Sequence, residues 1–218
     1  MPIAARLGLP GPFGAFNGGT VFNLDGQERC AFQVPADLAA ALLDLYAGAG
    51  LTRWLFATNR WLTSDPANPH TAREVQSSGL QPQAVADFAP VLGDADKVVA
   101  VCDDDTVMDR IEHQARALAG NRATVVRSQD YYLDATAPQA NKGDGVRRLA
   151  ALYGVPLAQV AVIGDQANDV AMFKVAGLAI AMGQAKGEVQ AAADAVTASN
   201  EEAGVAQAIA RFVLPRVG

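Results

Sequence analysis

Two carboxylates follow an apolar run in the C-terminal third of the chain. Residues 160–163 are all apolar and lead directly into Gly164-Asp165, and Asn168-Asp169 follow about one helical turn later. In a sheet of parallel strands, ligands bind beyond the carboxyl ends of the strands, which is where Asp165 would lie. Two carboxylates there suit a hard cation such as Mg²⁺, which takes a few oxygen ligands together with water and phosphate. Helix capping by Asn168 or Asp169 would explain only one residue, so we predict a metal site at Asp165 and Asp169.

A lysine lies just before a predicted helix, in the segment Asn141-Lys142-Gly143-Asp144-Gly145. The amino terminus of a helix already carries partial positive charge, so a lysine is unfavourable there unless an anion binds between the two. Taken alone, Lys142 is explained as well by a surface lysine in a turn. Because only one helix and one strand separate Lys142 from Asp165, the two segments together favour an anion site next to the metal site.

The two segments belong to a wider pattern that resembles one family. The chain is similar to Cof-like (subclass IIB) phosphatases of the haloacid dehalogenase-like superfamily, over nearly its whole length. The segments that resemble the C-terminal core of these phosphatases are Asn141-Lys142-Gly143, residues 164–169, residues 176–183, Ala193-Asp194, residues 197–202 and Gly204-Val205. The segments that resemble the family's cap domain and its entrance are Asn17-Gly18, Trp61, Gly79-Leu80 and residues 127–129 with Tyr131 and Tyr132.

The resemblance implies a phosphomonoester hydrolase that uses Mg²⁺ and acts on a small phosphorylated metabolite such as a sugar phosphate. An Asp nucleophile forms an aspartyl-phosphate, a second Asp serves as acid and base, and Mg²⁺ offsets the charge of carboxylates and phosphate. Lys142 would be catalytic, holding a phosphate oxygen and the nucleophile together. Asp165 would ligate Mg²⁺, and Asp169 would do so directly or through water. Asn168, Asn17 and Gly18 would bind the substrate phosphate.

The nucleophile itself is missing from the expected place. In the family, an apolar strand ending in Asp-x-Asp-Gly-Thr precedes the Asn-Gly matched by Asn17-Gly18, and none of the sixteen residues before Asn17 fits. We expect either an N-terminally truncated form of an enzyme or a catalytically inactive, ligand-binding or regulatory homologue that begins at Met1. The motifs that partly resemble the missing ones are residues 23–27, with Asn23 in the nucleophile's place, residues 57–60, and residues 102–106, which also read as a helix N-cap.

Helices and strands alternate from residue 141 onward, and these elements position the candidate site residues. A helix ending at Gly154, a strand at 160–163, a helix at 170–176, and strands at 178–182 and 195–197 predict parallel strands with crossover helices. Ser199 and Glu202 form a capping box for a last helix that should bury Val205, Ile209 and Phe212. The expected fold class is α/β, a doubly wound (Rossmann-like) core that is incomplete at its N-terminal side.

The preceding half reads as an inserted α+β cap. An Asp25-Gly26 turn between apolar runs predicts a hairpin. The further elements predicted are helices at 35–49, 72–77 and 106–118 and strands at 51–57, 97–102, 123–127 and 131–133. The expected domains are residues 1–20 as core remnant and linker, 21–137 as the specificity-determining cap, and 138–218 as the C-terminal part of the core. His70 and His113 should lie on the cap's surface.

Composition excludes several classes of function. Half of the 218 residues are apolar, 18% are charged and the net charge is −6. Without a basic run, a nucleic-acid partner is not expected. Without an apolar stretch long enough to cross a bilayer, neither is a membrane. The two cysteines read as reduced core residues, so we expect a cytoplasmic protein, and a homodimer or aggregation if a sheet edge is left open.

Overall fold

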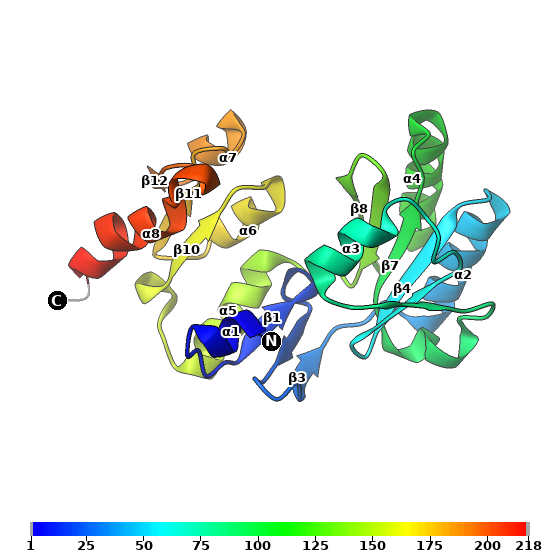
Figure 1. Cartoon of the computed structure of the whole chain (residues 1–218), viewed down its shortest axis with the longest axis horizontal. Helices are drawn as coiled ribbons and strands as arrows, with labels where there is room; N and C mark the ends of the chain where they lie inside the picture. The colour runs from blue at the N-terminus through cyan, green and yellow to red at the C-terminus, as the bar shows by residue number, and fades with distance from the viewer. Residues whose placement is uncertain (1, 217–218) are drawn as a thin grey trace. The chain divides into compact units, whose positions relative to one another are not determined.

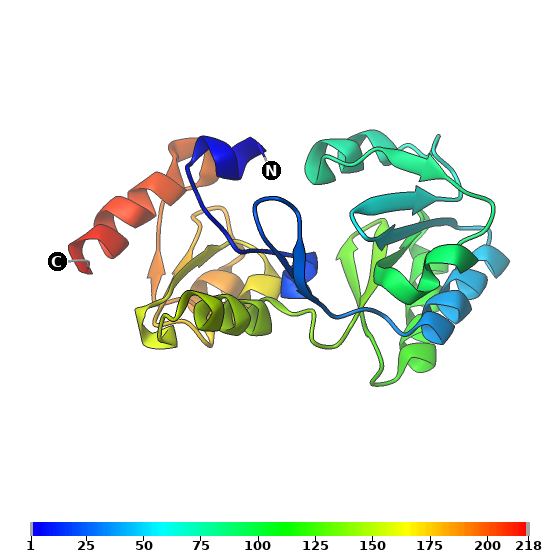
Figure 2. The same cartoon turned by 90° about the horizontal axis from the view of Figure 1, so that it is seen from below.

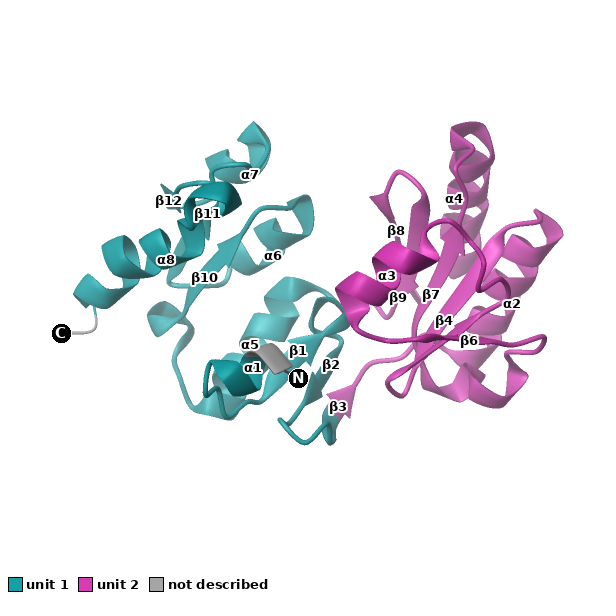
Figure 3. Ribbon diagram, viewed as in Figure 1, with its two compact units in different colours: residues 1–29, 141–218 teal, residues 30–140 magenta. Residues whose placement is uncertain are grey.

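The computed structural model describes residues 2–216, which form two compact units. Residues 1–29 and 141–218 make up the first, here called the core unit, and residues 30–140 make up the second, the inserted unit (Figure 3). The expected cap, residues 21–137, overlaps the inserted unit but starts and ends earlier. Within the described part of the chain, no helix combines the length and the apolar character needed to cross a membrane.

The core unit contains a three-stranded parallel sheet in the order β10-β11-β12. The strands are β10 (Ala161–Gly164), β11 (Leu178–Ala181) and β12 (Ala195–Val196), with Ala161 opposite Leu178 and Ile180 opposite Ala195. Helices α6 (Val170–Phe173) and α7 (Gly187–Ala191) lie in the two crossovers. This is the parallel α/β arrangement that the alternation of apolar segments predicted.

Both faces of this sheet are covered, as in a doubly wound fold. On one face, Val162 and Ala179 pack with Phe173 of α6 and Val189 of α7. On the other, Leu178 and Ile180 pack with Ala208 of α8 (Gly204–Ala208). Helix α5 (Lys142–Tyr153) precedes β10 and ends at Gly154, whose φ of 66° is the left-handed conformation that glycine adopts most easily.

The C-terminal helix differs from the prediction in which face it buries. The Ser199–Glu202 capping box is present, but it caps a short 3₁₀ turn, and Ala203, with φ 56°, separates that turn from α8. Val205 and Ile209 are 50% and 41% exposed, so their predicted burial was wrong. The cause is a close approach at Gly204, where a Cβ would lie 2.0 Å from the Ala198 carbonyl oxygen. This contact turns Gly204 and Ala208 inward.

The N-terminal segment forms a small sheet after α1 (Pro2–Arg6). Its strands, in the order β1-β2-β3, are β1 (Phe13–Ala15), β2 (Thr20–Phe22) and β3 (Glu28–Ala31). The Asp-Gly turn lies between β2 and β3 as predicted: Gly26 N–H donates to the Asn23 carbonyl oxygen at 3.0 Å. Asn23 therefore lies in a hairpin turn and not at the carboxyl end of a parallel strand, unlike the family's nucleophile.

The inserted unit is a six-stranded sheet with helices on both faces (Figures 1 and 2). The strand order is β6-β5-β4-β7-β9-β8. The strands are β4 (Thr52–Ala57), β5 (Arg60–Thr63), β6 (Pro82–Ala84), β7 (Ala95–Val101), β8 (Thr124–Gln129) and β9 (Tyr132–Thr136), and the helices are α2 (Ala36–Gly48), α3 (Thr71–Ser78) and α4 (Asp105–Ala119). Strands β5 and β6 were not predicted. Figure 2 shows α3 and α2 on opposite sides of the sheet.

The remaining two motifs that resemble catalytic ones have structural roles in the inserted unit. Thr58 and Asn59, both at positive φ, form the two-residue turn between β4 and β5, the backbone of a tight hairpin turn. Asp104 caps α4, its Oδ1 accepting the Val107 N–H at 3.0 Å. The N-cap interpretation of residues 102–106 is thus confirmed.

Candidate functional site

The candidate site starts at the carboxyl end of β10, where Gly164 permits a tight turn. A Cβ on Gly164 would lie 2.5 Å from Cγ of Asp169. Any larger residue would therefore push the Asp169 side chain out of its place. This packing explains the Gly-Asp pair at the strand end: Gly164 leaves room for the Asp169 carboxylate, and Asp165 supplies a second carboxylate next to it.

Asp169 is buried and has both carboxylate oxygens engaged. Its Oδ2 accepts the backbone N–H groups of Asp165 at 2.8 Å and Gln166 at 2.9 Å. Its Oδ1 forms an ion pair with Nζ of Lys142. The residue is 2% exposed, so these charge-assisted bonds lie in a poorly solvated place where they are strong. Asp169 therefore fixes the turn after β10 and holds the lysine.

Lys142 is the first residue of α5, and its ammonium is directed by Asp169. The side chain is about one-third exposed, so it remains partly accessible to solvent. The negative charge of the Asp169 carboxylate offsets part of the unfavourable interaction between the lysine and the helix amino terminus. Asn141 caps the same helix, its Oδ1 accepting the Asp144 N–H at 2.9 Å. Gly143 lets α5 approach α6, because a Cβ there would lie 2.6 Å from the Ala171 carbonyl oxygen.

Asp165 is half-buried and less constrained than Asp169. Its Oδ2 lies 3.3 Å from Nε2 of Gln166 and 3.3 Å from Nε2 of Gln184. Gln184 also accepts the Asn200 N–H at 3.0 Å. The sequence analysis missed Gln184, although it follows β11 at the same carboxyl edge as Asp165, which was the signal that could have identified it.

Asn17, Gly18 and Asn168 are brought together in the core unit. Nδ2 of Asn168 donates to Oδ1 of Asn17 at 3.1 Å. Asn17 is held in the left-handed region with φ 56°. A Cβ on Gly18 would lie 2.5 Å from the Cα of Gly145, so two glycines allow this turn to contact α5. Arg148 also donates to the Gly18 carbonyl oxygen at 2.7 Å.

The donor set fits Mg²⁺ through one carboxylate. Within residues 2–216, no group of three or more Asp, Glu, His or Cys side chains is arranged to hold a metal ion. Asp169 has both oxygens engaged by backbone N–H groups and Lys142, so Asp165 is the less constrained carboxylate of the pair. Mg²⁺ is commonly held by one or two carboxylates, with water and substrate phosphate supplying the rest. Asp165 meets that requirement in part, and further oxygen ligands are needed.

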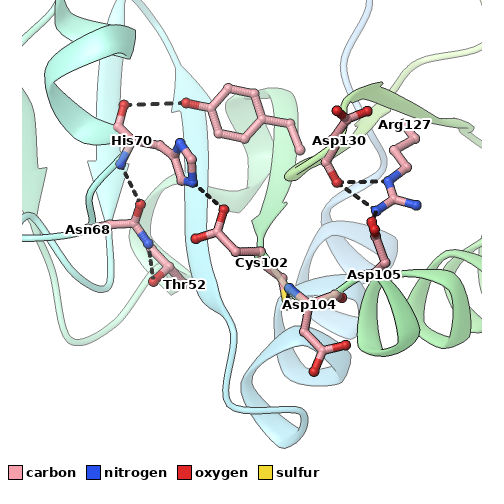
Figure 4. A network of polar contacts seen from close by, with 10 residues as sticks. Thr52, Asn68, His70, Cys102, Asp104, Asp105, Arg127 and Asp130 are labelled. Atoms are coloured by element: carbon pink, nitrogen blue, oxygen red, sulfur yellow. Dashed lines mark hydrogen bonds and ion pairs between the residues drawn. The ribbon is translucent and has the colours of Figure 1, made fainter.

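The two histidines lie in the inserted unit, and one differs from expectation. His113 is exposed, as predicted. His70 has only 18% of its side chain exposed and stacks on Tyr131 with ring centroids 3.7 Å apart. Its Nε2 lies 2.7 Å from Oδ1 of Asp103. Figure 4 shows Asn68 donating to the Thr52 hydroxyl and accepting the backbone N–H of His70. His70 is thus partly buried and packed on Tyr131, more enclosed than the predicted surface position.

Comparison with known proteins agrees with the resemblance found in the sequence. A family model described as haloacid dehalogenase-like hydrolase matches residues 1–209. Phosphatase YwpJ of Bacillus subtilis is 40% identical over 83 residues, which are 38% of this chain and 29% of that protein. The B. subtilis 5-amino-6-(5-phospho-D-ribitylamino)uracil phosphatase YcsE is 32% identical over 112 residues, 51% of this chain and 44% of that protein.

The similarity extends to solved structures. A haloacid dehalogenase-like hydrolase from Bacteroides thetaiotaomicron has a TM-score of 0.86 and 26% identity, over 97% of this chain and 81% of that one. The matched region spans less than half the length of each of the two curated relatives. Because the family model covers almost all of its residues, the chain belongs to the haloacid dehalogenase-like hydrolase family.

Proposed function

We propose that this chain carries the metal- and phosphate-binding part of a cytoplasmic, Mg²⁺-dependent phosphomonoester hydrolase. Its substrate would be a small phosphorylated metabolite such as a sugar phosphate. The observation that supports this most is the arrangement of Lys142, Asp169 and Asp165 at the carboxyl end of β10. The name of the relative YcsE, a phosphatase of a phosphoribityl compound, supports a phosphorylated sugar or sugar alcohol.

Each residue has a proposed role that follows from its contacts. Asp165 would hold Mg²⁺, which when bound offsets negative charge between the carboxylates and the phosphate. Asp169 would act as a positioning residue, aligning Lys142 and approaching the metal only through water. Lys142 would present its ammonium to a phosphate oxygen. Asn168, steadied by Asn17, would donate a hydrogen bond to the phosphate.

The nucleophile is proposed to come from a segment outside the 218 residues. Asn23, Thr58 and Asp104 lie in turns or a helix cap, so the motifs containing them do not provide it. Strand β10 pairs with β11 on one side, and within the described residues no strand pairs with its other edge. An additional parallel strand there would end beside Asp165, which is where an attacking carboxylate would be needed.

Hydrolysis of p-nitrophenyl phosphate with Mg²⁺ tests the proposal. We expect a protein extended upstream in the gene to turn over, and the 218-residue chain to show no comparable rate. In the extended protein, Asp165→Ala should lower kcat/KM by about a hundredfold or more, since one metal ligand is lost. The matched control is Glu201→Gln, an exposed acid of the core unit, which should retain full activity.

Two results would contradict it. Equal rates for the short and extended proteins would mean that the nucleophile lies within the chain after all. An upstream sequence without an Asp-x-Asp-Gly-Thr strand would instead favour the catalytically inactive, ligand-binding homologue.

The inserted unit is proposed to select the substrate. The segment concerned is roughly residues 21–133, the part of the chain outside the shared core pattern. Exchanging it for another cap in the extended enzyme should change which phosphate esters are hydrolysed. An unchanged substrate profile would refute this role.

A further inference from the structure

Asp165 and Asp169, the two carboxylates after β10, are contacted by groups of different charge. Oδ1 of Asp169 is paired with the ammonium of Lys142. Oδ2 of Asp165 lies instead against two neutral amides, with Nε2 of Gln166 and Nε2 of Gln184 each at 3.3 Å. A cation offsets the charge of a carboxylate, whereas a side-chain amide donates a hydrogen bond and carries no net charge. These contacts therefore orient Asp165 without neutralising it.

Gln184 links this carboxylate to a second loop. Its Nε2 donates to Asp165, which follows β10, and its Oε1 accepts the backbone N–H of Asn200 at 3.0 Å, in the turn after β12. Glutamine can do both because its amide has donors at one end and an acceptor at the other. The second amide, that of Gln166, belongs to the residue adjacent to Asp165 and lies in the same turn. Gln184, which follows β11, is thus the amide that ties Asp165 to the other loops of this sheet edge.

The loop that carries Gln184 is itself held in place. The Gly183 N–H donates to the Ala198 carbonyl oxygen at 3.1 Å. Nε2 of Gln190, on α7, donates to the carbonyl oxygens of Gly183 and Ala185, both at 3.0 Å. The backbone on either side of Gln184 is thus fixed, although Gln184 is exposed. A fixed backbone limits the positions that the amide can reach, which is what orienting a neighbouring carboxylate requires.

We propose that Gln184 is a positioning residue for the Mg²⁺ site. It holds the Asp165 carboxylate in one orientation through Oδ2, without using Oδ1 and without offsetting the negative charge that attracts the cation. Groups that hydrogen-bond to a metal ligand commonly set its orientation and strengthen metal binding in this way. The inference rests on the proposed function, in which Asp165 is the Mg²⁺ ligand.

A purely structural role is the alternative. In that case Gln184 serves only to close the turn after β12 by accepting the Asn200 N–H. Two substitutions distinguish the roles, because neither leucine nor lysine can accept that bond. Gln184→Leu also removes the donor to Asp165, whereas Gln184→Lys keeps a donor there and adds a positive charge. A turn-closing role predicts that both variants bind Mg²⁺ alike, and a positioning role predicts that they differ.

Magnesium titration of the 218-residue chain, followed by the backbone amide NMR signals of Asp165 and Gln166, measures the effect. Because the 3.3 Å contact is long, Gln184→Leu should raise the Kd for Mg²⁺ by about three- to tenfold, at or below the low end for a group that supports a metal ligand. Gln184→Lys should raise it at least about tenfold further, since an ammonium beside Asp165 opposes a cation. Gln184→Lys should nevertheless melt no lower than Gln184→Leu, because its charge can pair with Asp165.

The matched control is Gln159→Leu. Gln159 is an exposed glutamine of the same unit, in the turn that precedes β10, so its replacement should leave the Mg²⁺ affinity unchanged. Circular dichroism melts would establish that each variant is folded at the assay temperature. In a protein extended upstream, Gln184→Leu should raise the Mg²⁺ concentration for half-maximal rate by the same factor and leave kcat at saturating Mg²⁺ nearly unchanged.

A metal-free measurement tests the contact itself. Without Mg²⁺, Asp165→Ala should shift the side-chain amide signals of Gln184 and the backbone N–H signal of Asn200, and should leave the signals of Gln159 in place. Unmoved Gln184 signals would overturn the inference, because the amide would then not contact the carboxylate.

The wild-type titration separates this inference from the proposed function. If Mg²⁺ binds the wild type and Gln184→Leu with equal Kd, or if Gln184→Leu and Gln184→Lys weaken binding equally, the inference falls and the metal site stands. If the wild type gives no saturable Mg²⁺ response, the result counts against the proposed metal site, and the inference falls with it.

Discussion

Replacing Asp169 by Asn should be among the most destabilising conservative changes in the core unit. The carboxylate accepts two backbone N–H groups and pairs with Lys142 while 2% exposed. An amide can keep the oxygen that faces the turn, but its bonds become neutral ones, which are weaker by about 1 kcal/mol each. The loss of the counter-ion of Lys142, discounted because that side chain is one-third exposed, adds about 1 kcal/mol. The sum is about 3 kcal/mol.

Thermal melts followed by circular dichroism would measure this loss. For a chain of this size, about 3 kcal/mol corresponds to a fall in Tm of roughly 6–12 °C. Glu201→Gln is the control and should change stability by less than about 0.5 kcal/mol. A double-mutant cycle with Lys142→Met should give a coupling energy of about 1 kcal/mol. If Asp169→Asn melts within about 1 °C of the wild type, Asp169 does not anchor the turn after β10.

Three further predictions concern a close backbone approach, a buried carboxyl and a strand edge. Gly204→Ala should lower the free energy of unfolding by about 2–3 kcal/mol in urea titrations, because its Cβ would meet the Ala198 carbonyl oxygen. The control is Gly187→Ala, whose Cβ would have nothing within 4 Å and which should change stability by less than about 1 kcal/mol. Burial raises the pKa of Glu74, so the folded state holds that proton more tightly, and wild-type stability falls as the pH rises from the unfolded pKa to the raised folded one. The Tm advantage of Glu74→Gln should therefore grow as the pH rises above about 4.5. Because no described strand pairs with one edge of β10, association should increase with protein concentration in light scattering, and a monomer at all concentrations would refute this.

The strand and turn at the candidate site could be predicted because their signals are local. Four apolar residues followed by Gly164-Asp165 predict a strand and its end, and β10 (Ala161–Gly164) lies there. The alternation of short apolar segments likewise gave the parallel order of the sheet. These features depend on residues adjacent in sequence, so a single chain contains enough information to find them.

Other features depend on contacts that spacing does not specify. Strand β6 pairs in parallel with β5, and neither has a long alternating pattern, so the sheet context decides their structure. The positive φ of Ala203 changes which face of the last helix is buried. A periodicity counted from the capping box cannot detect this change. The backbone N–H groups that Asp169 accepts are visible only in the folded turn, so its role in fixing that turn could not be predicted from spacing.

Glycines, more than side-chain packing, bring the parts of the candidate site together. Gly164 admits Asp169, Gly143 lets α5 meet α6, and Gly145 lets the turn at Asn17-Gly18 lie against α5. A Cβ on Gly145 would lie 2.8 Å from the Cα of Gly18. Since the obstacle is backbone and not the end of a flexible side chain, the turn itself must move.

Gly145→Ala therefore tests whether the Asn17 turn belongs to the phosphate site. Alanine improves helix propensity by roughly 0.5–1 kcal/mol, so the loss of stability should be modest. Displacing the turn should nevertheless break the 3.1 Å bond between Asn168 and Asn17, which would shift the Asn168 side-chain amide signals in NMR spectra. Phosphate binding, read as stabilisation by phosphate and Mg²⁺, should weaken several-fold, whereas Gly187→Ala should bind normally. Displaced amide signals with unaltered phosphate binding would show that the turn supports the fold and not the site.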